Sequence, residues 1–301
     1  MKNLAKSTAT FICGIAMFLS ISSCSEKIPG DTNTDGQENG NAESSYESVV
    51  AELHCKSEGI DIYGLMYTPK AKTGKLPLII LSHSSSLTHA AMVPYAEYLS
   101  EKGYAAYCYD FCGACDSSKS KGRTTDEMTV FTEVDDLKIV LDKMKTLDYI
   151  DTDNVFVLGS SQGGLVTALV AEERPFDIQG MILFYPAFNI PDMIEKFSSF
   201  GNMGMSDAFV KAMKGYDVYA NIGKYLNDII IIHGTSDFIV NIKYSEKAVT
   251  KYKSAVLYPI QNANHGFNNE NLNGMASMLG GEKDDIVMPY VFDYLRTHIN
   301  K

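Results

Sequence analysis

The feature that most constrains this chain is a Gly-x-Ser-x-Gly turn at residues 159–163, which directly follows the apolar run 155–158. The run has the composition of a buried strand, and residues 165–173 have the composition of a helix. A strand can turn into a helix over so few residues only if Gly159 and Gly163 carry no side chains that would collide. Such a turn strains the backbone of Ser161 and exposes its hydroxyl, which favours a nucleophile over a Gly/Ser turn without chemistry.

The rest of the chain alternates between strand and helix patterns. The apolar runs 76–82, 180–185 and 229–232 lack polar alternation, as do strands that are buried on both faces. Further strands are expected at 49–55, 60–67, 104–109 and 255–258, and helices at 90–102, 130–146, 244–252 and 286–299. This alternation predicts an α/β fold over residues 49–301, in which helices flank a mostly parallel central sheet.

Residues 186–227 interrupt the alternation. They carry many Met and aromatic side chains, namely Phe188, Phe197, Phe200, Met203, Met205, Phe209, Met213, Tyr216 and Tyr219. Because the segment lies between two sheet strands, it predicts a small helical cap over the edge where open sheets bind ligands. Two interpretations stay open: these side chains line an apolar substrate pocket, or they pack the cap onto the body.

The amino terminus has the pattern of an export signal. Lys2 and Lys6 precede a short apolar run, and small residues lead to Cys24. Residues 1–24 resemble a bacterial lipoprotein signal peptide in which Cys24 is acylated, and an ordinary secretory signal with a chance cysteine is the alternative. The polar, acidic residues 25–48 predict a flexible linker. We expect an exported protein, anchored to a membrane in the periplasm or at the cell surface.

Net charge and cysteine content limit the kinds of partner and of metal or redox site that we expect. A net charge of −11 without any basic stripe argues against nucleic-acid binding, so that membrane contact is expected through the lipid anchor alone. Cys55, Cys108, Cys112 and Cys115 follow the signal, and a disulfide is possible in an exported protein. The Cys112-x-x-Cys115 pair lies in a loop, and no second pair completes a zinc site. We expect an incidental disulfide or free thiols.

A serine nucleophile needs a histidine base, and that histidine needs a carboxylate to orient it. Asp237 follows the apolar strand 229–232, and His265 follows the last strand. Both are therefore expected in loops at the sheet edge that carries Ser161. The chain order Ser161, Asp237, His265 also differs from the orders of the other two common serine triads. These three residues are the predicted catalytic triad.

Other candidates fit less well. Asp228 precedes its strand and would lie at the opposite edge of the sheet, while His54 falls in an amino-terminal strand. His89 begins a helix and His298 lies in the final helix. His233 is expected to pack or to form a structural hydrogen bond at the end of its strand.

The negative charge that develops on an attacked carbonyl oxygen needs two N–H donors. One is expected from the backbone of Gln162, because it follows the nucleophile in the turn. The second is expected from the loop after the third strand, at Ser85, where an ordinary polar turn is the alternative. This chemistry implies no metal and no cofactor.

Taken together, these residues resemble the α/β-hydrolase superfamily over residues 49–301, and within it the bacterial cinnamoyl (feruloyl) esterases and related serine esterases. The turn around Ser161 and the loop of Asp237 are specific for the superfamily. Weaker matches to the esterases are Asp110-Phe111-x-Gly113-x-x-x-Ser117, Glu127-Met128-Thr129-Val130, Tyr185-Pro186-Ala187 and His233-Gly234-Thr235-x-Asp237-x-x-Val240. The usual His-Gly before the oxyanion residue is His83-Ser84 in this chain.

The resemblance implies a serine esterase that acts on hydroxycinnamoyl or acetyl esters of plant polysaccharide, as small or polysaccharide-linked substrates. A second interpretation is a prolyl-oligopeptidase-like serine peptidase, against which Gln162 and the lack of a propeller-sized amino-terminal region argue. A third is a surface-binding lipoprotein on a degenerate hydrolase fold. The third would require a missing triad member, and none is missing.

Overall fold

The structure, a computed structural model, describes residues 45–197, 204–267 and 284–299. The predicted signal peptide, the lipidation site Cys24 and nearly all of the predicted linker 25–48 lie outside these residues, as do Phe200 and Met203 of the predicted cap. None of the described helices is long and apolar enough to cross a membrane.

Eight strands form one sheet in the order β1-β2-β4-β3-β5-β6-β7-β8. β1 pairs antiparallel with β2, and β2 with β4, while every pair from β4–β3 onward to β7–β8 is parallel. The strands are β1 (Ser48–Ser57), β2 (Ile60–Pro69), β3 (Leu76–Ser82), β4 (Ala105–Tyr109), β5 (Ile150–Ser160), β6 (Gly180–Phe184), β7 (Ile229–Gly234) and β8 (Ala255–Ile260). This confirms the predicted mostly parallel sheet.

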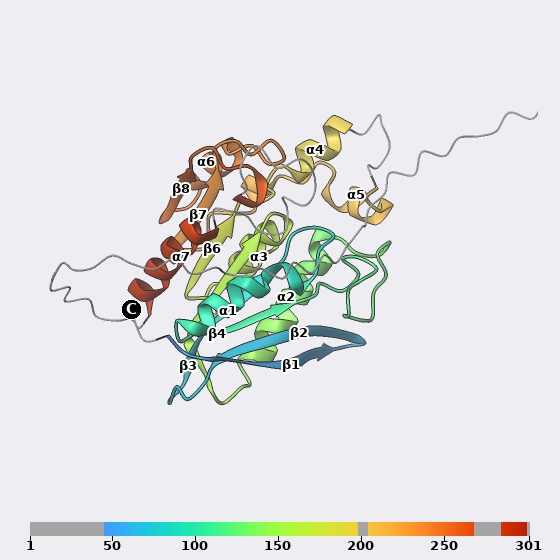
Figure 1. Cartoon of the computed structure of the whole chain (residues 1–301). Helices are drawn as coiled ribbons and strands as arrows, with labels where there is room; N and C mark the ends of the chain where they lie inside the picture. The colour runs from blue at the N-terminus through green and yellow to red at the C-terminus, as the bar shows by residue number, and fades with distance from the viewer. Residues whose placement is uncertain (1–44, 198–203, 268–283, 300–301) are drawn as a thin grey trace, which may run out of the picture. The chain divides into compact units, whose positions relative to one another are not determined.

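Helices cover both faces of the sheet (Figure 1). They are α1 (Val93–Glu101), α2 (Val130–Met144), α3 (Gln162–Glu173), α4 (Ile190–Phe197), α5 (Asp207–Met213), α6 (Lys243–Val249) and α7 (Asp284–His298), with short 3-10 turns η1 (His89–Met92), η3 (Val218–Ala220) and η4 (His265–Phe267). α1 and α7 pack on one face, and α2, α3 and α6 pack on the other. The predicted α/β fold is therefore confirmed.

The side chains of the central strands divide between two cores. In β3, Leu78 and Ile80 pack into the core beneath α2 and α3, while Ile79 and Leu81 pack into the core beneath α1 and α7. All four are fully buried. Because neighbouring side chains along a strand point to opposite faces, a strand covered by helices on both sides must be apolar throughout.

The segment between β6 and β7 contains α4, α5 and η3. Phe188, Phe209 and Met213 are buried in the core shared with α2 and α3, and Tyr219 packs partly buried against it. Among the described residues of this segment, the Met and aromatic side chains thus mainly attach it to the body. The packing interpretation therefore holds for these side chains, and Phe188, Tyr216 and Tyr219 also border a recess of about 280 Å³.

Candidate active site

Ser161 lies between the end of β5 and the start of α3, in a strained backbone conformation. Its φ is 51° and its ψ is −116°, a region that residues with a side chain rarely adopt. A Cβ on Gly159 would lie 2.3 Å from the carbonyl oxygen of Gly163, and one on Gly163 would lie 2.4 Å from that of His83. The two glycines therefore let the strand, the helix and the loop after β3 meet behind Ser161.

The structure brings Ser161, His265 and Asp237 into one hydrogen-bonded chain. His265 Nε2 lies 3.1 Å from Ser161 Oγ, and His265 Nδ1 lies 2.7 Å from Asp237 Oδ2. All three residues are buried, with 4% to 8% of their surface exposed. A proton on Nδ1 that is donated to the carboxylate leaves Nε2 free to accept the serine proton, as a general base requires.

The loops that follow neighbouring strands position the two partners of Ser161. Asp237 comes three residues after the end of β7, and His265 begins η4 after β8. The ring of His265 packs against the ring of Tyr185, with 4.5 Å between the ring centroids. Since β5, β6, β7 and β8 run parallel, their carboxyl ends meet at one edge of the sheet, and this arrangement places the three side chains together.

Four donors saturate the carboxylate of Asp237. Oδ1 accepts from the backbone N–H groups of Ile239 and Val240, each at 2.9 Å. Oδ2 accepts from His265 Nδ1 at 2.7 Å and from His233 Nε2 at 3.1 Å. Burial alone would raise the pKa of Asp237, but the hydrogen bonds from His233 and His265 outweigh burial and lower this pKa to about 2. Asp237 is therefore an anion at neutral pH.

Gln162, the first predicted oxyanion donor, is the first residue of α3. The N–H groups in the first turn of a helix have no partner within that helix, so the backbone N–H of Gln162 is available to an oxyanion. The side chain of Gln162 points elsewhere: its Nε2 donates to Glu133 Oε2 at 2.7 Å. Burial raises the pKa of Glu133, a residue of α2, to about 8.

Ser85, the second predicted donor, lies in the loop after β3, and that loop packs against the strand–helix turn at Ser161. The hydroxyls of Ser84 and Ser160 are 2.9 Å apart, so they join the loop to the last residue of β5. His83 Nε2 accepts from the backbone N–H of Phe111 at 3.1 Å, which leaves the proton on Nδ1 to be donated to the carbonyl of Ser84 at 2.8 Å. Because a serine replaces the usual glycine after His83, the loop gains a hydrogen bond to β5 through the hydroxyl of Ser84.

Glu133 was not predicted from the sequence, and only a structural hydrogen bond was predicted for His233. Glu133 had a usable signal, because it lies four residues before Leu137 and three after Val130 on the buried face of α2. A carboxylate on an apolar helix face must find a buried partner. His233 likewise continues an all-isoleucine strand that is buried on both faces. The remaining competitors lie elsewhere; for example, Asp228 binds His298 Nε2 at 2.8 Å.

The four described cysteines are free thiols. Cys55, Cys108 and Cys112 are buried, and Cys115 is half-buried. Burial raises the pKa of Cys55 to about 11 and that of Cys108 to about 12, so neither is a thiolate at neutral pH. These thiols behave as small apolar side chains of the core.

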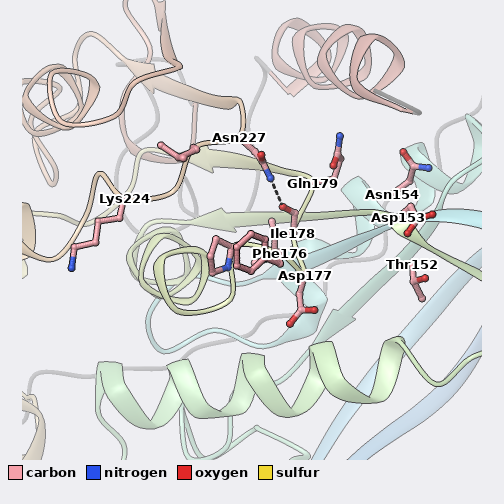
Figure 2. A pocket seen from close by; sticks show the side chains of 11 residues that line it. Thr152, Asp153, Asn154, Phe176, Asp177, Ile178, Gln179, Lys224 and Asn227 are labelled. Carbon is pink, nitrogen blue, oxygen red and sulfur yellow. Dashed lines mark hydrogen bonds between the residues drawn. The ribbon is translucent and has the colours of Figure 1, made fainter.

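A recess of about 710 Å³ lies at the other edge of the sheet (Figure 2). Side chains from the start of β5, the α3–β6 connection and the segment before β7 line it. Asp153 lies near the start of β5, eight residues before Ser161, which directly follows that strand, so roughly 25 Å of extended chain separates them. Asn227 donates its amide to the carbonyl of Ile178 at 2.9 Å, a bond that is used within the fold.

Comparison with known proteins agrees with this fold. Residues 75–222 match the family model described as "Serine aminopeptidase, S33". The chain resembles Est1E of Butyrivibrio proteoclasticus, solved with ferulic acid bound, with 24% identity, a TM-score of 0.70 and coverage of 83% of this chain and 100% of that one. Comparison with curated proteins gave no significant match.

Other solved structures share the fold at lower identity. A monoacylglycerol lipase of Paleococcus ferrophilus is 16% identical, with a TM-score of 0.60 and coverage of 79% of this chain and 99% of that one. An α/β-hydrolase of a Penicillium species, GrgF, is 12% identical, with a TM-score of 0.64 and coverage of 85% and 100%. With its parallel sheet, its strand–serine–helix turn and these structural neighbours, the chain has the α/β-hydrolase fold and resembles the cinnamoyl esterases.

Proposed function

We propose that this protein is a serine esterase that hydrolyses carboxylic esters through an acyl-enzyme. The observation that supports it best is the continuous chain from Ser161 Oγ through the ring of His265 to Asp237 Oδ2, with distances of 3.1 and 2.7 Å. In this proposal Ser161 attacks the ester carbonyl while His265 takes its proton and Asp237 stabilises the resulting imidazolium. His265 then returns the proton to the departing alcohol.

The oxyanion is held in this mechanism by the backbone N–H groups of Gln162 and Ser85. Each such donor is typically worth about 3 kcal/mol of barrier. Water then attacks the acyl group on Ser161, with His265 as general base, and releases the acid. All bonds are made and broken by this chain's residues, the ester and water.

The substrate class is proposed to be hydroxycinnamoyl or acetyl esters of plant polysaccharide. Est1E, the structural relative with ferulic acid bound, supports this choice at 24% identity. A peptidase is the second candidate, because the matching family model is described as a serine aminopeptidase. We prefer the esterase because Gln162 after the nucleophile argues against a prolyl-oligopeptidase-like peptidase, and because residues 110–117 and 185–187 resemble motifs of the esterases.

A substrate panel on residues 49–301 tests the proposal. It contains methyl ferulate, acetylated xylan, a short-chain aryl ester and an aminoacyl p-nitroanilide. We expect ester hydrolysis that falls by roughly 10⁴-fold or more in Ser161→Ala, and modification of Ser161 by a fluorophosphonate. Preferred cleavage of the anilide would instead support the peptidase, and an unmodified Ser161 in folded protein would support a binding protein.

We also propose that the protein is exported and held at a membrane by acylation of Cys24. The support is the sequence pattern around Cys24, with positive residues, a short apolar run and small residues before it. Growth with a labelled palmitate analogue tests this: the full-length chain should carry the label, and Cys24→Ala should not. Label that persists in Cys24→Ala would overturn the proposal.

A further inference from the structure

His233, a second buried histidine, contacts the carboxylate that orients His265. His233 lies in β7 and none of its surface is exposed. Its Nε2 is 3.1 Å from Asp237 Oδ2 and 2.8 Å from the carbonyl oxygen of Val240. Both neighbours are acceptors, so Nε2 carries a proton and shares it between them.

The opposite nitrogen of His233 is also occupied. Nδ1 lies 2.8 Å from the hydroxyl of Ser245, a fully buried residue of α6. The ring is therefore bonded at both nitrogens, to a helix on one side and to the loop of Asp237 on the other. With no solvent to replace either bond, the ring cannot rotate without leaving buried polar groups unpaired.

We propose that His233 is a positioning residue for the hydrolytic reaction. By donating from Nε2, it fixes the rotation of the Asp237 carboxylate so that Oδ2 faces His265, and Ser245 holds the ring of His233 in register. The inference rests on the proposed function, because it assigns a task to Asp237 within the triad. It extends the hydrogen-bonded chain from three side chains to five.

The geometry explains why a fourth donor to Asp237 matters. The backbone N–H groups of Ile239 and Val240 hold Oδ1 alone, and a carboxylate held at one oxygen can still turn its plane. His233 and His265 approach Oδ2 together, and two donors on one oxygen fix the orientation of its lone pairs. His233 also helps to keep Asp237 ionised, since its hydrogen bond, like that of His265, lowers the pKa of this carboxyl.

The test compares His233→Phe with His233→Gln and Ser245→Ala. Phenylalanine fills the space of the ring without a donor, whereas the amide of glutamine places an N–H near the original Nε2. We expect kcat for an aryl ester to fall on the order of 10- to 100-fold in His233→Phe, with KM little changed, because the base loses its alignment and binding does not. His233→Gln should recover most of that loss, and Ser245→Ala should lose only a few-fold.

The second readout needs no activity. The proton between His265 Nδ1 and Asp237 Oδ2 should give a low-field proton NMR resonance in the wild type, in Ser161→Ala and in His233→Gln. In His233→Phe the resonance should shift or broaden, because Asp237 is no longer fixed. Thermal unfolding of each variant monitors folding. If His233→Phe does not fold, kcat and the resonance are compared between the wild type, Ser245→Ala and His233→Gln.

The inference is overturned if folded His233→Phe keeps the wild-type kcat and resonance. It is also overturned if His233→Gln loses as much kcat as His233→Phe, or if the loss appears in KM alone. Failure of the proposed function has a different signature: the wild type would not hydrolyse esters, yet the dependence of the low-field resonance on His233 would remain measurable.

Discussion

The two edges of the sheet differ in how their polar groups are used. At the carboxyl ends of the parallel strands, Ser161, Asp237, His265 and His233 are all less than a tenth exposed and bond to one another. At the amino ends, the recess is bordered by Phe176, which is 101% exposed, and by other side chains that face solvent.

This difference shows that size alone is a poor guide to a reactive site. The recess is large, yet a polar contact at its wall, from the partly exposed amide of Asn227 to the carbonyl of Ile178, serves the fold. The edge at the carboxyl ends of the strands carries a carboxylate and imidazoles whose burial must be offset by mutual hydrogen bonds. Substitutions matched between the two edges should therefore have very unequal effects.

The largest effect is expected from Asp237→Asn. An amide presents N–H groups to His265 Nδ1, favours the wrong tautomer, and should lower kcat by roughly 10⁴-fold with the fold intact. Asp153→Asn is the matched control at the other edge, where the carboxylate is exposed, and it should leave kcat unchanged. Steady-state kinetics on an aryl ester measures both, and equal losses would remove the contrast between the edges.

Gly163→Ala is expected to have a smaller effect on kcat and also to lower the free energy of unfolding. Its new Cβ would meet the carbonyl oxygens of His83 at 2.4 Å and Ser82 at 2.5 Å, which are backbone atoms that cannot step aside cheaply. We expect a loss of about 1–3 kcal/mol in unfolding free energy. We also expect a lower kcat, because the loop after β3, which contains Ser85, is displaced. Denaturant unfolding and kinetics check this, and a fully active, equally stable variant would contradict it.

Glu133→Gln should change how stability depends on pH. The folded protein keeps Glu133 protonated up to about pH 8, whereas the unfolded chain releases that proton near its ordinary value of 4.5. The wild type therefore loses stability as the pH rises through this window. The variant has no ionisable group at this position, so its stability does not fall for this reason. The variant should gain stability relative to the wild type from pH 5 to pH 8.

Thermal midpoints across that pH range provide the measurement for Glu133→Gln. Asp136, one turn further along α2, is bonded to Arg123 at 3.0 Å in both proteins, and its charge contributes to the raised pKa of Glu133 that the substitution removes. Asp153→Asn again supplies the exposed control and should run parallel to the wild type. A constant difference between Glu133→Gln and wild type at every pH would show that Glu133 does not titrate in this window.

The smallest effect is expected from Phe176→Ser at the recess. The ring makes no buried contact that its loss would remove, so unfolding free energy should stay within about 0.5 kcal/mol of wild type. kcat and KM for soluble aryl esters should not change. A large loss of activity in Phe176→Ser would mean that the two edges are coupled, so that substitutions at the recess affect hydrolysis as well.

Much of the fold was predictable because strands that are buried on both faces are continuous apolar runs. Asp237 and His265 could be placed at the edge of Ser161 because each follows its own core strand, and parallel strands align their carboxyl ends. The contacts of Glu133, His233 and Ser84 could not be predicted, since they depend on the rotation of α2, the docking of α6 and the path of the loop after β3. Those are outcomes of packing between segments far apart in the sequence.

The position of β8 has a consequence for how the protein would lose activity. β8 is the outermost strand, paired only with β7 in the described sheet, and Val256 within it is 49% exposed. His265 is held by the connection that follows this strand. Local opening of one sheet edge would thus separate His265 from Ser161 while the central strands stay paired. On heating, hydrolysis should fail before the bulk of the secondary structure melts.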